Sequence, residues 1–276
     1  MIVKQFLIVG ASGEAGQSAI QAIRSLDKSA IIIGTTTGVN DIIGVDFTLH
    51  NVRADQSIVQ LILSQMSKVG HEPEFEAIIY TPALGEVGIP IANTTKHALE
   101  ESLAISYDPM ILLEKKFEPK KMVAYSAFYW LDHTKSFYGA MGHVKRIMDE
   151  WAIAKPTSRK IVRAGTFFSQ SVRGISIVLQ RMMKKTNDPE LLELKKAYES
   201  SNSKFLDFFL QYAWDHEKAA FSSNFPAIAY RPTKRDDLSR GLIAVLKGTS
   251  PITSVLGDWT WEENQLPVLP DWFTRI

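Results

Sequence analysis

The sequence predicts an α/β protein built on a doubly wound parallel sheet of about seven strands, with a helical insertion late in the chain. Short apolar runs alternate with helical patterns at regular spacing, which is typical of parallel strands joined by crossover helices. A glycine-rich turn follows the first apolar run directly and leads into a helical pattern. The composition, 45% hydrophobic and 22% charged, suits one large α/β domain of 276 residues.

The glycine-rich turn is the first motif with a chemical meaning. The apolar run 6–9 predicts a buried strand, and a helical pattern follows the turn at 17–23. Glycines let the backbone approach a pyrophosphate closely, and a helix N-terminus offers free N–H groups. A plain strand–helix turn is the alternative. We predict a single Rossmann-type NAD(P)-binding domain over 1–276, with cofactor-binding residues in this turn at Gly10, Ser12, Gly13, Glu14, Ala15 and Gly16.

The next two strands leave the choice of cofactor open. A fold that prefers NAD often carries Asp or Glu at the end of its second strand, here 30–34. The sequence has Thr35 and Thr36 there, and hydroxyls can hold either a ribose hydroxyl or a phosphate. We therefore expect NAD(H) or NADP(H) without a preference. After the third strand, 45–49, Asn51 and Val52 are expected to flank the adenine.

The middle of the chain continues the alternation. The fourth strand ends in Thr81, Pro82 and Ala83, where a dinucleotide would pass over the strand ends. The remaining elements follow in order: strands at 76–80, 122–127 and 160–165, and helices at 57–66, 93–106, 108–117 and 144–152.

The pattern changes over about 166–224, where a long, mainly helical section carries many apolar residues. We expect this lid insertion, with Phe168 near its start, to line a pocket for an apolar small-molecule substrate. An ordinary helical subdomain or an oligomer surface is the alternative. A helix at 233–246, a seventh strand at 254–258 and a coiled tail rich in Trp and Pro complete the expected fold.

A tyrosine and a lysine mark the junction between the fifth strand and its helix. Tyr138 precedes Lys145 by seven residues, close to two helical turns, so the two share roughly one face. An ammonium beside a phenol lowers its pKa, and such a tyrosine can donate a proton to a developing oxyanion. The alternative is a packed aromatic with a solvated lysine. Ser126 lies twelve residues before Tyr138 and is either a catalytic hydroxyl or a small residue at a strand end.

This layout resembles the short-chain dehydrogenase/reductase superfamily over about 3–260, and most closely its enoyl-acyl carrier protein reductases. Those enzymes carry Tyr-x6-Lys, as in Tyr138 and Lys145, often with Met-Gly between, as in Met141-Gly142. Asp149 matches their acidic residue four positions after the lysine, and Gly142 stands where most of the superfamily has its lysine. The glycine motif, the long insertion and Gly257-Asp258-Trp259 near the C-terminus depart from the enoyl reductases.

The resemblance implies an NAD(P)H-dependent reduction of an enoyl thioester. Tyr138 would hydrogen-bond the thioester oxygen, and Lys145 would hold the nicotinamide ribose. Gly165 and Thr166 would lie beside the nicotinamide. The substrate pocket would be walled by Tyr138, Phe168 and an aromatic before the catalytic tyrosine, either Phe128 or Tyr129. Family members are usually dimers or tetramers, so a homo-oligomer is expected.

Two other functions stay open. Ser126, Tyr138 and Lys145 together would serve a ketone or alcohol oxidoreductase. Alternatively, the chain is a non-catalytic NAD(P)-binding sensor, like those atypical members of the superfamily that keep the fold and lose the active site.

Composition excludes several other classes. The net charge is +1 without long charge runs, so nothing favours nucleic acid as a partner. The chain has no cysteine, which excludes disulfides and thiolate metal sites and suits a reducing compartment, so we expect a cytoplasmic protein. The first apolar run is too short for a signal peptide or a membrane span. The six histidines show no metal-ligand spacing, and no metal site is expected.

Overall fold

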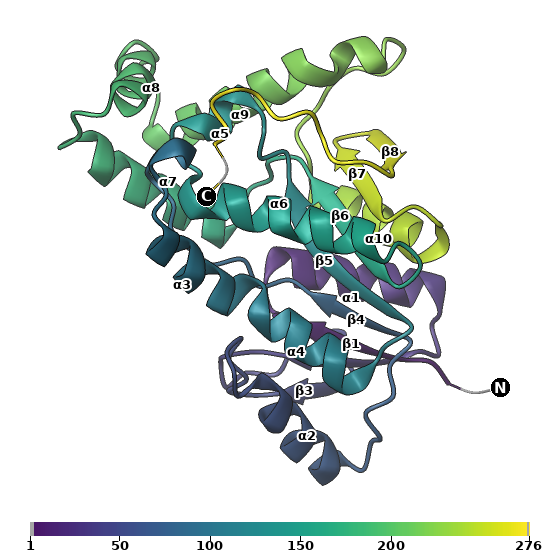
Figure 1. Ribbon diagram of the computed structural model, residues 1–276. Coiled ribbons are helices and arrows are strands. Elements are labelled where there is room, and N and C mark those ends of the chain that lie inside the picture. The colour runs from purple at the N-terminus through teal and green to yellow at the C-terminus, as the bar shows by residue number, and fades with distance from the viewer. Residues whose placement is uncertain (1–2, 275) are drawn as a thin grey trace.

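The computed structural model describes residues 3–274 and 276; the span 1–276 predicted as one domain also includes residues 1, 2 and 275, which lie outside that description. One eight-stranded sheet has the order β3-β2-β1-β4-β5-β6-β7-β8 (Figure 1). The first seven strands are parallel, and β8 pairs antiparallel with β7. The predicted doubly wound sheet is confirmed.

The strands alternate with helices as the sequence indicated. The strands are β1 (Gln5–Val9), β2 (Ile31–Thr35), β3 (Phe47–Leu49), β4 (Ala77–Tyr80), β5 (Lys121–Ala127), β6 (Arg159–Ala164), β7 (Ile252–Leu256) and β8 (Trp259–Glu263). The helices are α1 (Glu14–Leu26), α2 (Ile58–Val69), η1 (Ile91–Asn93), α3 (Lys96–Ser106), α4 (Asp108–Phe117), α5 (Asp132–Lys135), α6 (Gly139–Ala154), α7 (Gln170–Met183), α8 (Pro189–Glu199), α9 (Phe205–Phe221), η2 (Ser222–Asn224) and α10 (Arg235–Lys247).

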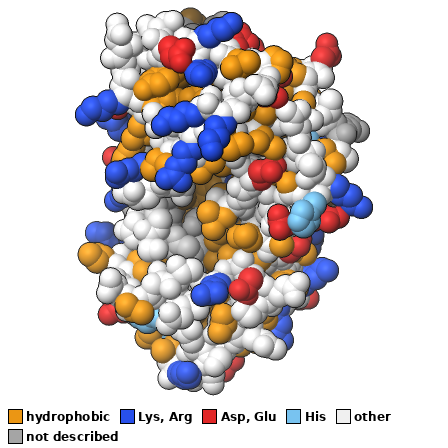
Figure 2. All heavy atoms as spheres, turned by 90° about the vertical axis from the view of Figure 1, so that its left-hand side faces the viewer, with side chains coloured by type: hydrophobic (Ala, Val, Ile, Leu, Met, Phe, Trp, Pro, Cys, Tyr) orange, Lys and Arg blue, Asp and Glu red, His pale blue; other side chains and the backbone are white. Residues whose placement is uncertain are grey.

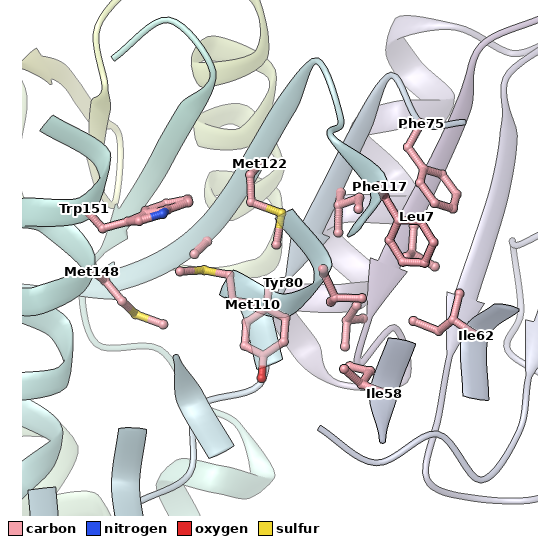
Figure 3. Packing of buried hydrophobic residues seen from close by; sticks show 14 of the residues in the cluster. Leu7, Ile58, Ile62, Phe75, Tyr80, Met110, Phe117, Met122, Met148 and Trp151 are labelled. Carbon is pink, nitrogen blue, oxygen red and sulfur yellow. The ribbon is translucent and has the colours of Figure 1, made fainter. Parts of the chain in front are cut away.

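Both faces of the sheet are covered, which is why its strands read as continuous apolar runs. On one face α2, α4 and α6 pack Ile58, Met110 and Trp151 against strand residues such as Leu7 and Met122 (Figure 3). On the other face α1 and α10 cover the sheet with a second apolar cluster. The two clusters hold the strands in one layer and fix where their carboxyl ends emerge.

The strand order reverses between β1 and β4. The chain runs outward from β1 through β2 to β3, then returns to form β4 on the opposite side of β1. The loops after β1 and β4 therefore leave the sheet in different directions. In open α/β sheets, ligands bind in the crevice that such a reversal creates at the carboxyl ends of the strands.

The lid insertion contains three α-helices, α7, α8 and α9, and η2. In Figure 1, α7 and α8 lie beside the carboxyl ends of the strands. Many of its apolar side chains form a buried cluster that includes Leu179, Met183, Phe205, Phe208 and Phe209, together with Phe137 from the segment before α6. The three helices pack their apolar faces into this cluster.

Two parts of the chain were not anticipated. The tail was expected to be coil, but Trp259–Glu263 forms β8, because Trp259 is buried and the strand closes the edge of β7. A four-residue helix, α5, precedes the Tyr138 junction. Among the described residues, the model contains no helix with both the length and the apolar character needed to cross a membrane.

Candidate functional site

The glycine turn between β1 and α1 is shaped by two of its three glycines. Gly10 has a φ of +76°, and a Cβ there would lie 2.7 Å from Thr81 Oγ1. A Cβ on Gly16 would lie 2.5 Å from the Gly10 carbonyl oxygen, so α1 packs directly onto the turn. Gly13 is different: a Cβ there would meet only the Gly10 oxygen, at 3.5 Å. The fold itself requires Gly10 and Gly16, whereas Gly13 leaves an open approach to the backbone.

The N-terminus of α1 is available to an anion. Gly13 is its N-cap and has no side chain to accept from the first-turn N–H groups. Glu14, in the first turn, is paired with Arg235 of α10, whose Nε and Nη2 donate hydrogen bonds of 2.8 and 2.7 Å. Arg235 therefore offsets the one negative charge next to this helix end. Ser12 stands at the other side of the turn, with its Oγ 3.4 Å from Thr36 Oγ1.

The threonine hydroxyls after β2 organise the turn. Thr35 Oγ1 accepts from the Gly10 N–H at 3.1 Å, and Thr36 Oγ1 accepts from the Gly38 N–H at 3.0 Å. Both threonines are buried. The Val52 N–H donates to the Thr36 carbonyl at 2.9 Å, which brings the loop after β3 against the loop after β2. The hydroxyls thus support the loops around the site in addition to any contact with a cofactor.

The end of β3 borders a hollow. A cavity of about 420 Å³ lies between this strand end and α2, lined by Thr48, Leu49, His50, Asn51, Leu61, Ser64, Gln65, Lys68 and Val69. Asn51 adopts a φ of +56° there and is exposed, whereas Val52 is buried. Of the two residues expected to flank the adenine, Asn51 is therefore the accessible one.

The loop after β4 covers the tyrosine junction. Thr81 Oγ1 donates to the Val9 carbonyl at 2.8 Å and fixes the start of the loop over β1. Further along, the Gly88 N–H donates to the Phe137 carbonyl at 2.6 Å, and the Gly139 N–H donates to the Ile89 carbonyl at 3.1 Å. Pro82 is half-buried and Ala83 exposed. The segment 84–90 therefore lies directly on the backbone around Tyr138.

Tyr138 and Lys145 lie at the start and in the second turn of α6, as the spacing predicted. Lys145 was expected to lower the pKa of Tyr138, but burial raises this pKa. Lys145 Nζ instead donates to the Tyr125 carbonyl at 2.7 Å. Burial lowers the pKa of Lys145 to about 8, although Asp149 opposes the shift. Tyr138 is thus a neutral phenol, and the ammonium lies against the backbone of β5.

Ser126 faces α6. Its Oγ lies 3.4 Å from the Lys145 carbonyl oxygen, and the side chain is buried. The hydroxyl therefore sits at the interface between β5 and α6, close to the backbone of the helix that carries Tyr138 and Lys145.

The three aromatic residues expected beside Tyr138 have different surroundings. Phe128 is buried in a cluster with Leu131, Leu256 and Trp259. Tyr129 is fully buried in another cluster, which Tyr138 contacts from its edge. Both rings pack against residues from the C-terminal part of the chain, and Tyr129 also lines a cavity of about 200 Å³ with Arg146 and Leu269. The role of either ring as a wall of the substrate pocket stays a prediction. Phe168, in contrast, is 53% exposed at the start of the lid insertion.

The segment after β6 is held by α9. Gly165 has no room for a side chain, because a Cβ would meet Leu256, Thr233 Oγ1 and Glu217. The Thr166 N–H donates to Glu217 Oε1 at 2.5 Å, and Trp214 Nε1 donates to the Thr166 carbonyl at 2.9 Å. Sequence reasoning missed Glu217. The helix at 205–221 also carries Asp207 and Asp215, so the sequence held no signal that distinguishes Glu217 from these carboxylates.

A buried ion pair between β6 and α6 was also not predicted from the sequence. Arg163 Nη2 contacts Asp149 Oδ2 at 2.6 Å, and both side chains are fully buried. Glu263 of β8 also pairs with Arg163. The arginine stands between Val162 and Ala164 at the buried end of the strand, and a charged residue in that position is the signal that could have revealed the pair.

Comparison with known proteins gives a result at the level of fold. No family model matches the sequence, and no curated protein matches it. Solved structures do match. An aldohexose dehydrogenase from Thermoplasma acidophilum superposes with a TM-score of 0.56, covering 88% of this chain and 87% of that chain at 13% identity.

The chain has the fold of the short-chain dehydrogenases/reductases. A member from Leptospira borgpetersenii, solved with bound NAD+, gives a TM-score of 0.55 at 13% identity and covers 92% of each chain. An NADPH-dependent reductase of bacilysin biosynthesis gives 0.56 at 11% identity, covering 95% of this chain and 99% of that chain. The resemblance to this superfamily is confirmed in its fold, and the enoyl reductase type stays a prediction.

Proposed function

We propose that this protein is an NAD(P)H-dependent oxidoreductase. The observation that carries the proposal is the open turn at Gly13, in front of an uncapped α1, at the point where the strand order reverses between β1 and β4. Such a turn suits the pyrophosphate of a dinucleotide because it offers backbone N–H groups and the positive end of a helix dipole.

The cofactor is assigned along the carboxyl ends of the strands. Its adenosine end belongs at the loops after β2 and β3, where Asn51 is accessible, and its nicotinamide belongs at Gly165 and Thr166. Lys145 lies between these ends and is assigned to the nicotinamide ribose. When bound, the reduced cofactor supplies a hydride. The ion pair with Arg235 offsets the negative charge of Glu14, which would otherwise repel the pyrophosphate.

We further propose an enoyl thioester as the substrate. Tyr138 is a protonated phenol at neutral pH, and burial raises its pKa further, so it does not ionise there. A protonated phenol donates a hydrogen bond to a thioester oxygen as enolate charge develops on it, and this interaction is strongest in the transition state. Tyr138 would orient and stabilise that oxygen, while the clusters around its ring exclude water.

The surface beside the Tyr138 loop suits an apolar substrate with an anionic handle. Helix α7 exposes Ile177, Val178 and Met182, and an added Cβ on Gly88 would lie 3.1 Å from Val178. Residues 166–187 contain no Asp or Glu, and their basic side chains are exposed. Figure 2 shows apolar side chains around a hollow on this side of the molecule, with Lys and Arg gathered above it. An acyl chain bearing phosphate groups has this combination of properties.

The test is a fluorescence titration with NADH and with NADPH, followed by oxidation of the bound cofactor by a crotonyl thioester. Gly13→Ala is the decisive variant, because its Cβ is tolerated by the fold yet fills the open approach. We expect at least about tenfold weaker cofactor binding, since about 1.4 kcal/mol of lost contact is a factor of ten. Gly174→Ala is the matched control, because nothing lies within 4 Å of a Cβ there. Equal binding by wild type and Gly13→Ala would refute the assignment of the turn.

A second candidate is a dinucleotide-binding sensor without turnover. Two observations favour it: the Lys145 ammonium is hydrogen-bonded to Tyr125, and segment 84–90 covers the backbone around Tyr138. A sensor would bind the cofactor tightly and leave it unoxidised with enoyl thioesters and ketones alike. Ketone reduction through Ser126 would instead appear as turnover with ketones alone, and the direction of Ser126 toward α6 speaks against it.

A further inference from the structure

Glu217 is a buried carboxylate at the end of β6 that no part of the proposed chemistry uses. It lies on α9 and is 1% exposed. The Thr166 N–H donates to its Oε1 at 2.5 Å, and the Tyr230 hydroxyl donates to its Oε2 at 3.0 Å. A Cβ on Gly165 would lie 3.2 Å from Oε2, so the carboxylate is pressed against the backbone of the strand end.

Helix α9 holds both polar backbone groups of Thr166. Glu217 accepts its N–H, and Trp214 Nε1 donates to its carbonyl at 2.9 Å. The position of this peptide therefore depends on the lid insertion as well as on the sheet. Any group that lies on Gly165 and Thr166 has the Glu217 carboxylate as its neighbour in a medium of low polarity.

We propose that Glu217 is a positioning residue whose charge links the oxidation state of the bound nicotinamide to pH. This inference rests on the proposed function. The oxidised nicotinamide ring is a cation and the reduced ring is neutral, so an ionised carboxylate favours the oxidised form, and the attraction is large where water is excluded. A protonated Glu217 keeps its hydrogen-bonding role and loses that preference.

Both charge states of Glu217 are accessible near neutral pH. Burial raises its pKa to about 7, while the hydrogen bonds from Thr166 and Tyr230 lower it. The charged and titratable groups next to Glu217 on its own helix are Asp215, His216 and Lys218. From α5, which packs against this helix, His133 faces His216, and burial lowers the pKa of His133 to about 3. Among the described residues, Glu217 forms no ion pair.

The test measures dissociation constants for the oxidised and the reduced form of the same dinucleotide between about pH 5.5 and 8.5. In the wild type, the ratio of the oxidised to the reduced constant should fall at least about fivefold as pH rises through the titration of Glu217. Glu217→Gln should keep the hydrogen bond from Thr166 and give a flat ratio. Asp215→Asn, an exposed carboxylate on the same helix, should leave the wild-type dependence in place.

A second variant keeps the proposal testable if Glu217→Gln fails to fold. Tyr230→Phe removes a hydrogen bond that favours the ionised carboxylate, so the midpoint of the ratio should move to higher pH. If Glu217 had a purely structural role, Tyr230→Phe would leave the pH dependence of the ratio unchanged.

The outcomes separate this inference from the proposed function. Tight binding of both forms with a pH-independent ratio in the wild type would overturn the inference alone. The same dependence in Glu217→Gln as in the wild type would also overturn it. Failure of the folded protein to bind either form would refute the proposed function and, with it, this role of Glu217.

Discussion

The buried pair of Asp149 and Arg163 shows how single residues position the site. Asp149 follows Lys145 by four residues on α6, so the two side chains project from the same side of the helix. Arg163 of β6 binds the carboxylate at 2.6 Å, and its guanidinium also lies 4.7 Å from the ring centroid of Trp130. The pair therefore fixes the orientation of α6 about its own axis relative to the sheet, and this orientation sets the position of Lys145.

Asp149→Asn should destabilise the protein by about 3–5 kcal/mol, because it leaves part of a buried positive charge uncompensated. Urea denaturation measures the loss. The matched control is Glu150→Gln, one position along the helix, which breaks a partly exposed pair with Arg146 and should cost less than about 1 kcal/mol. Equal losses of stability in the two variants would show that the buried ion pair contributes no more to stability than the partly exposed one.

At the scale of elements, the lid insertion is a packing unit with its own core. Its cluster joins α7, α8 and α9 and also includes Phe137, which precedes α6. Its described links to the rest of the molecule further include two polar contacts of α8. Asn93 Nδ2 donates to Asp188 at 2.7 Å, and Lys135 pairs with Glu190 at 3.1 Å. A unit with its own core and partly exposed links can open without unfolding the sheet.

Phe209→Ala should loosen this unit selectively. The ring is buried and packs edge-on against Phe137 at 4.9 Å between centroids, so its removal should cost about 3–5 kcal/mol of local stability. Hydrogen exchange should show lost protection over 170–221 and little change in β1, β4 and β5. Phe168→Ala, at an exposed ring, should change neither. Uniform loss of protection across the sheet would show that lid and sheet unfold together.

Two buried groups of opposite kind should contribute to the pH dependence of the whole molecule. Burial raises the pKa of Glu217 from 4.5 to about 7, so between these values the folded state binds more protons and stability falls as pH rises. Burial lowers the pKa of His133 from 6.5 to about 3, so in that window the unfolded state binds more protons and stability rises with pH. Their slopes oppose each other between pH 4.5 and 6.5, and the Glu217 contribution continues to about pH 7.

Glu217→Gln should therefore gain stability relative to the wild type as pH increases. Between pH 5 and pH 8 the relative gain should be about 2–3 kcal/mol, because each unit of pKa shift corresponds to about 1.4 kcal/mol. Urea denaturation of both proteins at the two pH values measures it, with Asp215→Asn as the control for loss of a carboxylate. A difference that stays constant from pH 5 to pH 8 would show that Glu217 does not titrate in this range.

The α/β class, the alternation of elements and the place of the glycine turn could all be predicted from the amino-acid sequence. These depend on local properties: the apolar runs of doubly covered strands, and glycines at a positive φ or a close backbone approach, as at Gly10 and Gly16. The same holds for the place of the tyrosine–lysine motif at the junction of β5 and α6, where Tyr138 is the N-cap of α6 and Lys145 lies in its second turn.

The contacts of these side chains could not be predicted in this way, because they depend on the packing of the folded chain. Lys145 bonds Tyr125, Glu217 reaches Thr166 across about fifty residues of chain, and Arg163 finds Asp149 between a strand and a helix. The pairing of β8 with β7 and the burial of the lid aromatics likewise depend on partners distant in sequence. The spacing of residues in the sequence sets which face of a helix or strand each residue occupies. Burial and hydrogen bonding depend instead on the neighbours that pack around a side chain. Because burial and hydrogen bonds set the charge states of the titratable groups, the proposed chemistry depends on the tertiary structure.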